Sequence, residues 1–160
     1  MLWRKTLLVG AMLGAVLSLS TGAAAQNSSF FGTWRQNLSK SKIARGAPQK
    51  DRLLVISPYG QDGWMRVVLN QNQRGEWVEE HYMVMLDGKD YPTMGNDPRV
   101  VTAKRLNNGT VEISLKRDGK VSSVQLLTVS PDGKTLTQLG SGVSGDGQHY
   151  EDDLRVYDRM

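Results

Sequence analysis

Side chains capable of catalysis or metal binding are few in this chain. Two histidines, His81 and His149, and no cysteine occur among the 160 residues. A metal site needs ligands that converge on one point, and each histidine lies in a predicted strand whose neighbouring side chains alternate between faces. The Gly-x-Ser-x-Gly turn that exposes a nucleophilic serine is absent. We therefore expect no catalytic residues, no metal and no cofactor, and a protein that is not an enzyme.

The first 25 residues have the composition of a secretory signal peptide. Arg4 and Lys5 precede an uncharged apolar run, and an Ala-x-Ala sequence ends at Ala25, where a signal peptidase accepts small side chains. The run is too short for a membrane-spanning helix, which needs about 20 apolar residues. We expect residues 1–25 to be removed on export to the periplasm or the cell exterior. Residues 26–160 are then one domain with no transmembrane segment.

The charge of residues 26–160 argues against a nucleic-acid partner. This part of the chain holds 18 Lys and Arg against 16 Asp and Glu, and no basic cluster stands out. The absence of cysteine excludes disulfides, and a chain of this length buries enough surface to fold without them. The sequence leaves the oligomeric state open.

Glycine turns divide residues 26–160 into short segments typical of β-strands. Segments rich in Val, Leu, Thr and aromatic residues lie between these turns and predict about nine strands. Short connections make successive strands adjacent and antiparallel. Ser39–Ala47 could form one short turn of helix, and residues 88–98 are expected to form a loop. The turns are Asp62-Gly63, Arg74-Gly75, Asp87-Gly88, Asn108-Gly109, Asp118-Gly119, Asp132-Gly133 and Asp146-Gly147.

An antiparallel meander of this size has exposed edges unless it closes on itself. Closure into an up-and-down barrel of about 8–10 strands removes those edges, whereas a sandwich usually needs Greek-key crossings. We therefore predict an all-β, antiparallel up-and-down β-barrel, with a sandwich as the alternative.

The faces of the predicted strands are not uniformly apolar. Val111, Ile113 and Leu115 share a clean apolar face, but the strand at Glu76–Leu86 carries aromatic and charged side chains on both faces. Mixed faces fit a barrel that holds polar groups and a ligand, or short strands whose exposure changes at the barrel ends. In the first case, the residues expected to line the ligand cavity are Trp64, Trp77, Tyr82, Met83 and, from a loop that could act as a lid at the barrel mouth, Tyr91. The alternative for that loop is a hairpin corner in which Tyr91 packs over the barrel end.

Several motifs resemble those of one class of small β-barrels. They run from Gly32-Thr33-Trp34 through Asp87-Gly88-Lys89-Asp90-Tyr91-Pro92 and Ser130-Pro131-Asp132-Gly133 to Val156-Tyr157-Asp158-Arg159. On these residues the chain resembles the lipocalin-like (calycin) proteins, and in particular a group of small secreted bacterial proteins of unknown function. The resemblance implies a lipocalin-like barrel that binds a small apolar or amphipathic ligand. The alternative is a solid barrel that acts as an envelope interaction or stress protein and binds no small molecule.

A more distant resemblance to fatty-acid-binding proteins, which also begin with Gly-Thr-Trp and end with Arg-x-Tyr, implies a ligand clamp. In that family the Arg and Tyr hold the carboxylate of the ligand, and the matching residues here are Arg155 and Tyr157. Strand alternation places Leu154 and Val156 on the opposite face. If that apolar face points inward, Arg155 lies at the surface or pairs with an acid.

The lipocalin resemblance also implies a structural role for a terminal arginine. In lipocalins the tryptophan of Gly-x-Trp packs beneath an arginine from the end of the barrel. Arg155 or Arg159 is therefore expected to stack on Trp34, which would make Gly32-Thr33-Trp34 part of the barrel closure rather than of a binding site.

Overall fold

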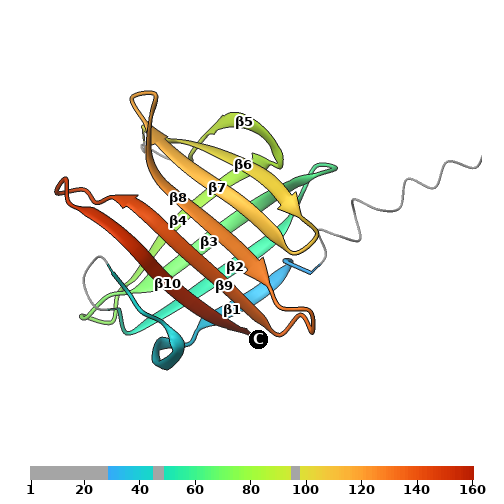
Figure 1. Ribbon diagram of the computed structural model, residues 1–160. Helices are drawn as coiled ribbons and strands as arrows, with labels where there is room; N and C mark the ends of the chain where they lie inside the picture. Colours follow the sequence, from blue (N-terminus) through green and yellow to red (C-terminus); the bar gives the residue numbers. More distant parts are fainter. Residues whose placement is uncertain (1–28, 45–48, 95–97) are drawn as a thin grey trace, which may run out of the picture.

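Ten antiparallel strands and one short 3-10 helix make up the part of the chain that the computed structural model describes, residues 29–44, 49–94 and 98–160 (Figure 1). The predicted signal segment lies outside these residues. In chain order the elements are β1 (Gly32–Gln36), η1 (Leu38–Lys40), β2 (Asp51–Tyr59), β3 (Gly63–Gln71), β4 (Trp77–Met85), β5 (Asp87–Pro92), β6 (Val100–Asn107), β7 (Thr110–Arg117), β8 (Lys120–Val129), β9 (Thr135–Val143) and β10 (His149–Arg159). None of the helical residues described forms a segment long and apolar enough to cross a membrane.

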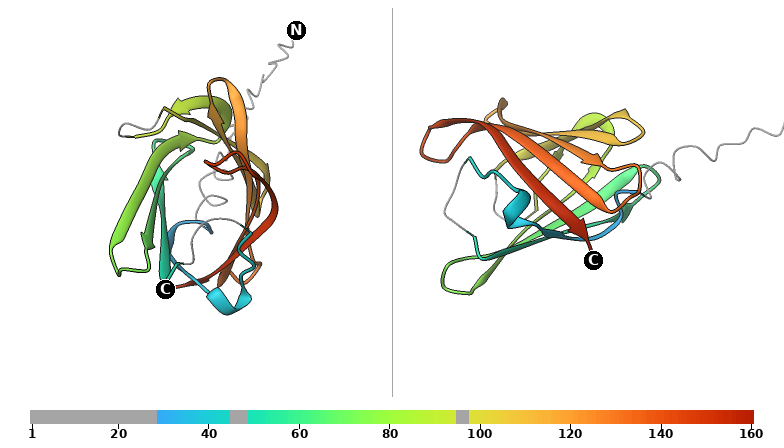
Figure 2. Two further views of the ribbon diagram at one scale, coloured as in Figure 1. Left: turned by 90° about the vertical axis from the view of Figure 1, so that its left-hand side faces the viewer. Right: turned by 60° about the horizontal axis from the view of Figure 1, so that its bottom comes forward.

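The strands form one sheet in the order β4-β3-β2-β1-β10-β9-β8-β7-β6-β5. Strand β1 pairs with β10, so the first and the last of the described strands meet inside the sheet, and the sheet curls into a barrel (Figure 2). Strands β4 and β5 are the ends of the sheet and share no ladder of hydrogen bonds. The barrel is therefore nearly closed, and the prediction of an all-β up-and-down barrel is confirmed.

One end of the barrel is closed by the residues that the sequence motifs single out. The Arg159 guanidinium lies 4.0 Å from the centre of the Trp34 ring, and Trp34 itself is fully buried. Arg159 also donates hydrogen bonds to the carbonyl oxygens of Phe31 at 2.7 Å and Gly133 at 2.6 Å, while the Trp34 indole donates to the carbonyl of Phe30 at 2.9 Å. The expected stacking is confirmed, and Arg159 rather than Arg155 provides it.

Gly32 must be a glycine for this closure to form. Its φ angle is +131°, and a Cβ atom at this position would lie 2.8 Å from Nη1 of Arg159. We expect Gly32→Ala to lower the free energy of unfolding by about 1–3 kcal/mol, because the backbone is strained and Arg159 must move. Chemical denaturation measures this change. Gly145→Ala is the matched control, since a Cβ there meets no atom within 4 Å and should leave stability nearly unchanged.

Three local expectations are corrected. Residues Asp87–Pro92, expected in a turn and a loop, form β5, which pairs with β6 through an irregular register. Where the structure describes the expected turn at Ser39–Ala47, the helix spans Leu38–Lys40, and the Asn37 side chain caps it by accepting a hydrogen bond from the Lys40 amide. Residues 45–47 of that turn lie outside the described residues. The Asp87-Gly88 dipeptide does not make a tight hairpin, because β4 and β5 are not paired.

The inward face of β10 is also the reverse of the one that its apolar residues suggest. Asp153, Arg155 and Tyr157 are buried, whereas Leu154 is only half-buried. The register of β10 with β9 shifts between Tyr150 and Asp153. Both residues are buried, although side chains three positions apart on a regular strand point to opposite faces. Arg155 therefore lies in the interior and pairs there with an acid.

Candidate functional site

The barrel interior has an apolar half and a polar half. At the closed end the protein's own side chains fill the space, and Phe30 packs against Trp64 with ring centroids 4.8 Å apart. The cluster includes Trp34, Leu54, Ile56, Trp64, Val84, Val111, Leu127 and Leu136, all fully buried or nearly so. Toward the other end the inward positions become polar, and this polar half contains the candidate site.

A cavity of about 680 Å³ occupies the polar half of the barrel. Its inner wall includes Arg52, Arg66, Tyr82, Gln125 and Arg155. Its rim is formed by the first half of β4, by Thr93, Met94 and Arg99 in the β5–β6 connection, and by Ser144 and Gly145 in the β9–β10 turn. The size falls within the range of small-molecule sites, which occupy about 300–1,000 Å³.

Arg66 is held in this cavity by its neighbours on two strands. Its guanidinium donates hydrogen bonds to the Tyr82 hydroxyl at 3.0 Å and to Oε1 of Gln138 at 2.8 Å. Burial raises the pKa of the Tyr82 phenol, and the nearby Arg66 charge opposes that rise. Nε of Arg66 is buried and has no hydrogen-bond partner among the described residues. Arg66 is therefore fixed in place, and its buried Nε is unpaired among the described residues.

Arg52 lies close to Arg66, Arg155 and Tyr157. Burial lowers the pKa of its guanidinium, and the positive charges of Arg155 and Arg66 lower it further, whereas Tyr157 and Glu80 act in the opposite direction. Nε of Arg52 is also buried without a partner in the described part of the chain. Two guanidiniums that repel one another in a poorly solvated site create a strong local preference for an anion.

Arg155, by contrast, is already neutralised. Its Nε donates to the Asp153 carboxylate at 2.9 Å, and its Nη1 donates to Oε1 of Gln49 at 3.3 Å. Tyr157 is fully buried beside β1, and its hydroxyl has no partner among the residues described. The Arg155–Tyr157 pair implied by fatty-acid-binding proteins is thus inside the barrel, but its charge is satisfied by the protein itself.

The buried charges of the described residues are unbalanced. Three arginines, Arg52, Arg66 and Arg155, face one carboxylate, Asp153. Buried charges are normally paired because an isolated charge loses its hydration. Among the buried groups the excess of two positive charges is concentrated on Arg52 and Arg66, whereas the carboxylates of Glu79 and Glu80 lie at the exposed rim of the same cavity. The inner wall of the cavity therefore favours negative charge.

Of the five aromatic and methionine residues expected to line the cavity, the structure brings only Tyr82 to it. Trp64 is fully buried in the apolar half, and Tyr91 packs against that core from β5. Trp77 is 47% exposed, and Met83 shares the outward face of β4 with it, because Tyr82 and Val84 take the inward positions.

The sequence motifs do not single out Arg52 and Arg66, although a signal for both exists in the sequence. Each lies two residues from inward apolar side chains: Arg52 is in phase with Leu54, and Arg66 is in phase with Trp64 and Val68. An arginine in the apolar phase of a strand indicates an inward charge.

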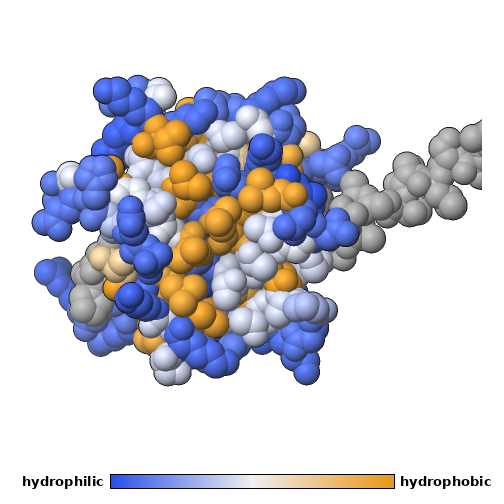
Figure 3. All heavy atoms as spheres, viewed as in Figure 1, coloured by the Kyte–Doolittle hydropathy of each residue, from blue (hydrophilic) through white to orange (hydrophobic). Residues whose placement is uncertain are grey.

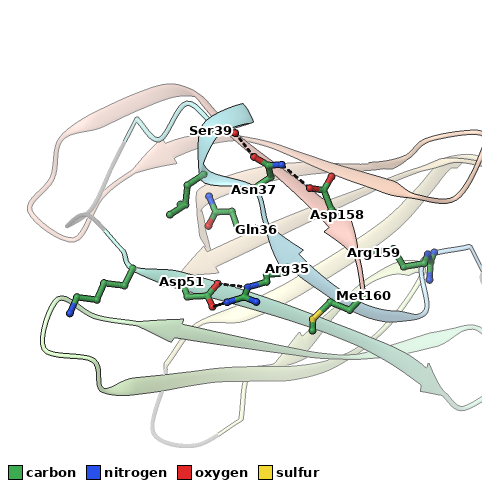
Figure 4. A pocket seen from close by; sticks show the side chains of 10 residues that line it. Arg35, Gln36, Asn37, Ser39, Asp51, Asp158, Arg159 and Met160 are labelled. Carbon is green, nitrogen blue, oxygen red and sulfur yellow. Dashed lines mark hydrogen bonds and ion pairs between the residues drawn. The ribbon is translucent and has the colours of Figure 1, made fainter.

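A second depression lies near η1 and the ends of β1 and β10, with a volume of about 720 Å³ (Figure 4). There Arg35 bonds to Asp51 at 2.6 Å, and Asn37 donates to Asp158 at 2.7 Å and lowers the pKa of that carboxyl. Because its carboxylates are already held by neighbouring side chains, this groove has structural contacts rather than free groups for a ligand.

The architecture can be compared with known proteins. No protein-family model matches the chain, and no curated protein matches it. A solved structure of the wild-type fluorescent protein UnaG matches with a TM-score of 0.56 and 15% identity, covering 84% of this chain and 99% of that chain. The fold is calycin-like. An asparagine-to-alanine variant of UnaG matches with a TM-score of 0.52 and 14% identity over 83% of this chain and 97% of that chain. At such identities the likeness concerns the fold alone.

Proposed function

We propose that this calycin-like barrel binds a small anionic amphipathic molecule in its polar half and performs no catalysis. The observation that carries the proposal is the pair of buried guanidiniums, Arg52 and Arg66, each with an unpartnered Nε beside one cavity. A carboxylate, sulfonate or phosphate group would supply the missing negative charge and accept charge-assisted hydrogen bonds.

The filled closed end limits the apolar part of the ligand. Trp34 and Trp64 occupy the space that a long acyl chain would need, so the ligand's apolar part must lie within the cavity and toward its rim. Tyr82 and Leu115 offer the cavity some apolar surface, and Met94 does so at the rim. This favours a compact amphipathic anion over a purely apolar molecule. A barrel filled along its whole length would instead have favoured the solid interaction protein.

Export is a second part of the proposal, and it is supported by the sequence of residues 1–25 alone. The intact mass of the protein recovered from the host's periplasm or medium tests it. Cleavage after Ala25 is the expected result. Recovery of the uncleaved chain in the cytoplasm would contradict export without affecting the proposed ligand site.

A matched pair of fluorescent probes tests the proposed ligand class. Anilinonaphthalenesulfonate carries one sulfonate, whereas phenylnaphthylamine has the same aromatic skeleton and no charge. The sulfonate should bind at least about tenfold more tightly, because only it can bond to the arginines. Equal affinity for the two probes would refute anion recognition. Native mass spectrometry of protein from its own host would then identify a natural ligand that co-purifies.

Asp153 should weaken the binding of anions, since it neutralises Arg155 and adds negative charge to the site. We expect Asp153→Asn to tighten sulfonate binding by about three- to tenfold while lowering protein stability, because Arg155 loses its ion pair. Probe titration well below the unfolding midpoint measures the affinity. Asp118→Asn, in the exposed β7–β8 turn, is the control and should change neither property. Weaker binding by Asp153→Asn in a folded protein would contradict this arrangement of charge.

A further inference from the structure

A row of leucines crosses the outer surface of the barrel. Their side chains point away from the interior, which contains the proposed ligand site. Leu126 on β8, Leu139 on β9 and Leu154 on β10 are direct partners in the strand register. Figure 3 shows a band of apolar side chains across the face formed by these strands. Leu139, at the centre, is 42% exposed. This is a contiguous apolar surface rather than a scatter of single residues.

These leucines point outward because their neighbours point inward. Gln125 and Leu127 flank Leu126 and are buried, as are Asp153 and Arg155 on either side of Leu154. Successive side chains of a strand take opposite faces, so the three leucines share the outer surface.

On β8 and β9 the rows on either side of the leucines carry no charge, whereas on β10 the exposed Glu151 and Asp152 lie in the bulge opposite Ser141. One contains Thr128 on β8 paired with Thr137 on β9, and the other contains Val124 paired with Ser141. The uncharged surface of leucine, threonine, valine and serine on β8 and β9 can approach another sheet without desolvating an ion, and the acids of the β10 bulge lie at its margin.

The two ends of the leucine row carry opposite charges. Glu112 on β7 is the register partner of Leu126, and Lys42 forms an isolated bridge with Leu154. Neither side chain forms an ion pair with another described residue, although Lys104 lies one strand beyond Glu112 in the register. The row therefore reads Glu112, Leu126, Leu139, Leu154, Lys42 from one side to the other.

This order is self-complementary under a two-fold rotation. A rotation axis that runs along β9 through Leu139 places Lys42 of a second copy opposite Glu112 and places Leu154 opposite Leu126. Each copy contributes both charges, so two identical ion pairs flank one leucine cluster. We propose that this face, centred on Leu139, binds a second copy of the chain to form a symmetric dimer.

The size of the surface sets the strength of the dimer. The row spans four strand spacings of about 4.8 Å, or about 19 Å, which is smaller than the side of a standard interface of about 800 Å² per partner. The dimer should therefore be weak, with a dissociation constant on the order of micromolar. The ligand cavity opens elsewhere, so dimer formation does not depend on the proposed ligand.

Charge reversal tests the proposed dimer, because each substitution changes both ion pairs. Sedimentation of the purified protein from about 1 μM to about 1 mM gives the dissociation constant. Lys42→Glu and Glu112→Lys should each weaken the dimer by about tenfold, since two attractive pairs become repulsive. The double variant Lys42→Glu/Glu112→Lys should return to within about threefold of the original affinity. Leu139→Lys, which places two charges on the axis, should leave only monomer.

A lysine outside the row provides the control. Lys120 lies at the exposed start of β8, about 20 Å along the strand from Leu126, and Lys120→Glu should leave the dimer unchanged. Circular dichroism verifies that every variant is folded. A monomeric wild-type protein over the whole concentration range would overturn the proposal. A dimer that Lys42→Glu affects no more than Lys120→Glu, or that the double variant fails to restore, would overturn it as well.

Discussion

Trp34→Ala is expected to lower the free energy of unfolding by about 3–5 kcal/mol, the range for removing a buried tryptophan or phenylalanine. The substitution empties the centre of the closed end, removes the ring beneath Arg159 and leaves the Phe30 carbonyl without its indole donor. Urea denaturation measures the change as a shift of the midpoint at constant slope.

Trp77→Ala is the matched control for this prediction. Trp77 is 47% exposed on β4, so its removal should cost less than about 1 kcal/mol. Similar losses for the two variants would show that Trp34 is no more important than a surface tryptophan, and would contradict its role in closing the barrel.

Arg66→Met should weaken the binding of anilinonaphthalenesulfonate by about 10- to 100-fold. A hydrogen bond to a charged group contributes about 1.5–3 kcal/mol, and each 1.4 kcal/mol corresponds to a factor of ten in affinity. Methionine is apolar and flexible, so it fills much of the space of Arg66 without its charge. The effect should be confined to the anionic probe, and phenylnaphthylamine should bind as before.

Two further variants separate charge from geometry at this site. Arg66→Lys keeps the positive charge but loses the planar donor group, so it should retain part of the affinity for the sulfonate. Arg117→Met removes an exposed arginine from β7 and should leave binding unchanged. If Arg66→Met and Arg117→Met bind the sulfonate equally well, the anion is not held by the buried arginines.

The fold could be predicted from local patterns because each strand is bounded by its own turn. The Asp118-Gly119 pair, for example, takes positive φ at both residues and joins β7 directly to β8. Strand β5 could not be predicted in this way, because Asp87, Gly88 and Asp90 have poor strand propensity. Its pairing with β6 is a tertiary effect that no local pattern expresses.

The site was harder to predict, since alternation gives two faces but does not say which face is inside. On β10 the apolar face suggested the interior, yet Arg155 and Tyr157 are buried and Leu154 is half-exposed. On the first half of β4 neither face is buried, and Trp77 and Val78 are both exposed. The apolar face of a strand is usually assigned to the interior, and this assignment fails in a barrel that has a polar cavity and an apolar outer face. Only the pairing of all the strands shows which face points inward.

The pairing of β1 with β10 has a consequence for the order of events in folding. Every other ladder in the sheet joins strands that follow one another along the chain, and each can form as a hairpin while the chain is still being made. The β1–β10 ladder must wait for β10, which follows the other nine described strands and ends with Arg159. Until it arrives, Trp34 has no cation above it and β1 keeps a free edge. The joining of β1 to β10 is thus a late, long-range step, and a chain that lacks the end of β10 would retain its hairpins without this ladder.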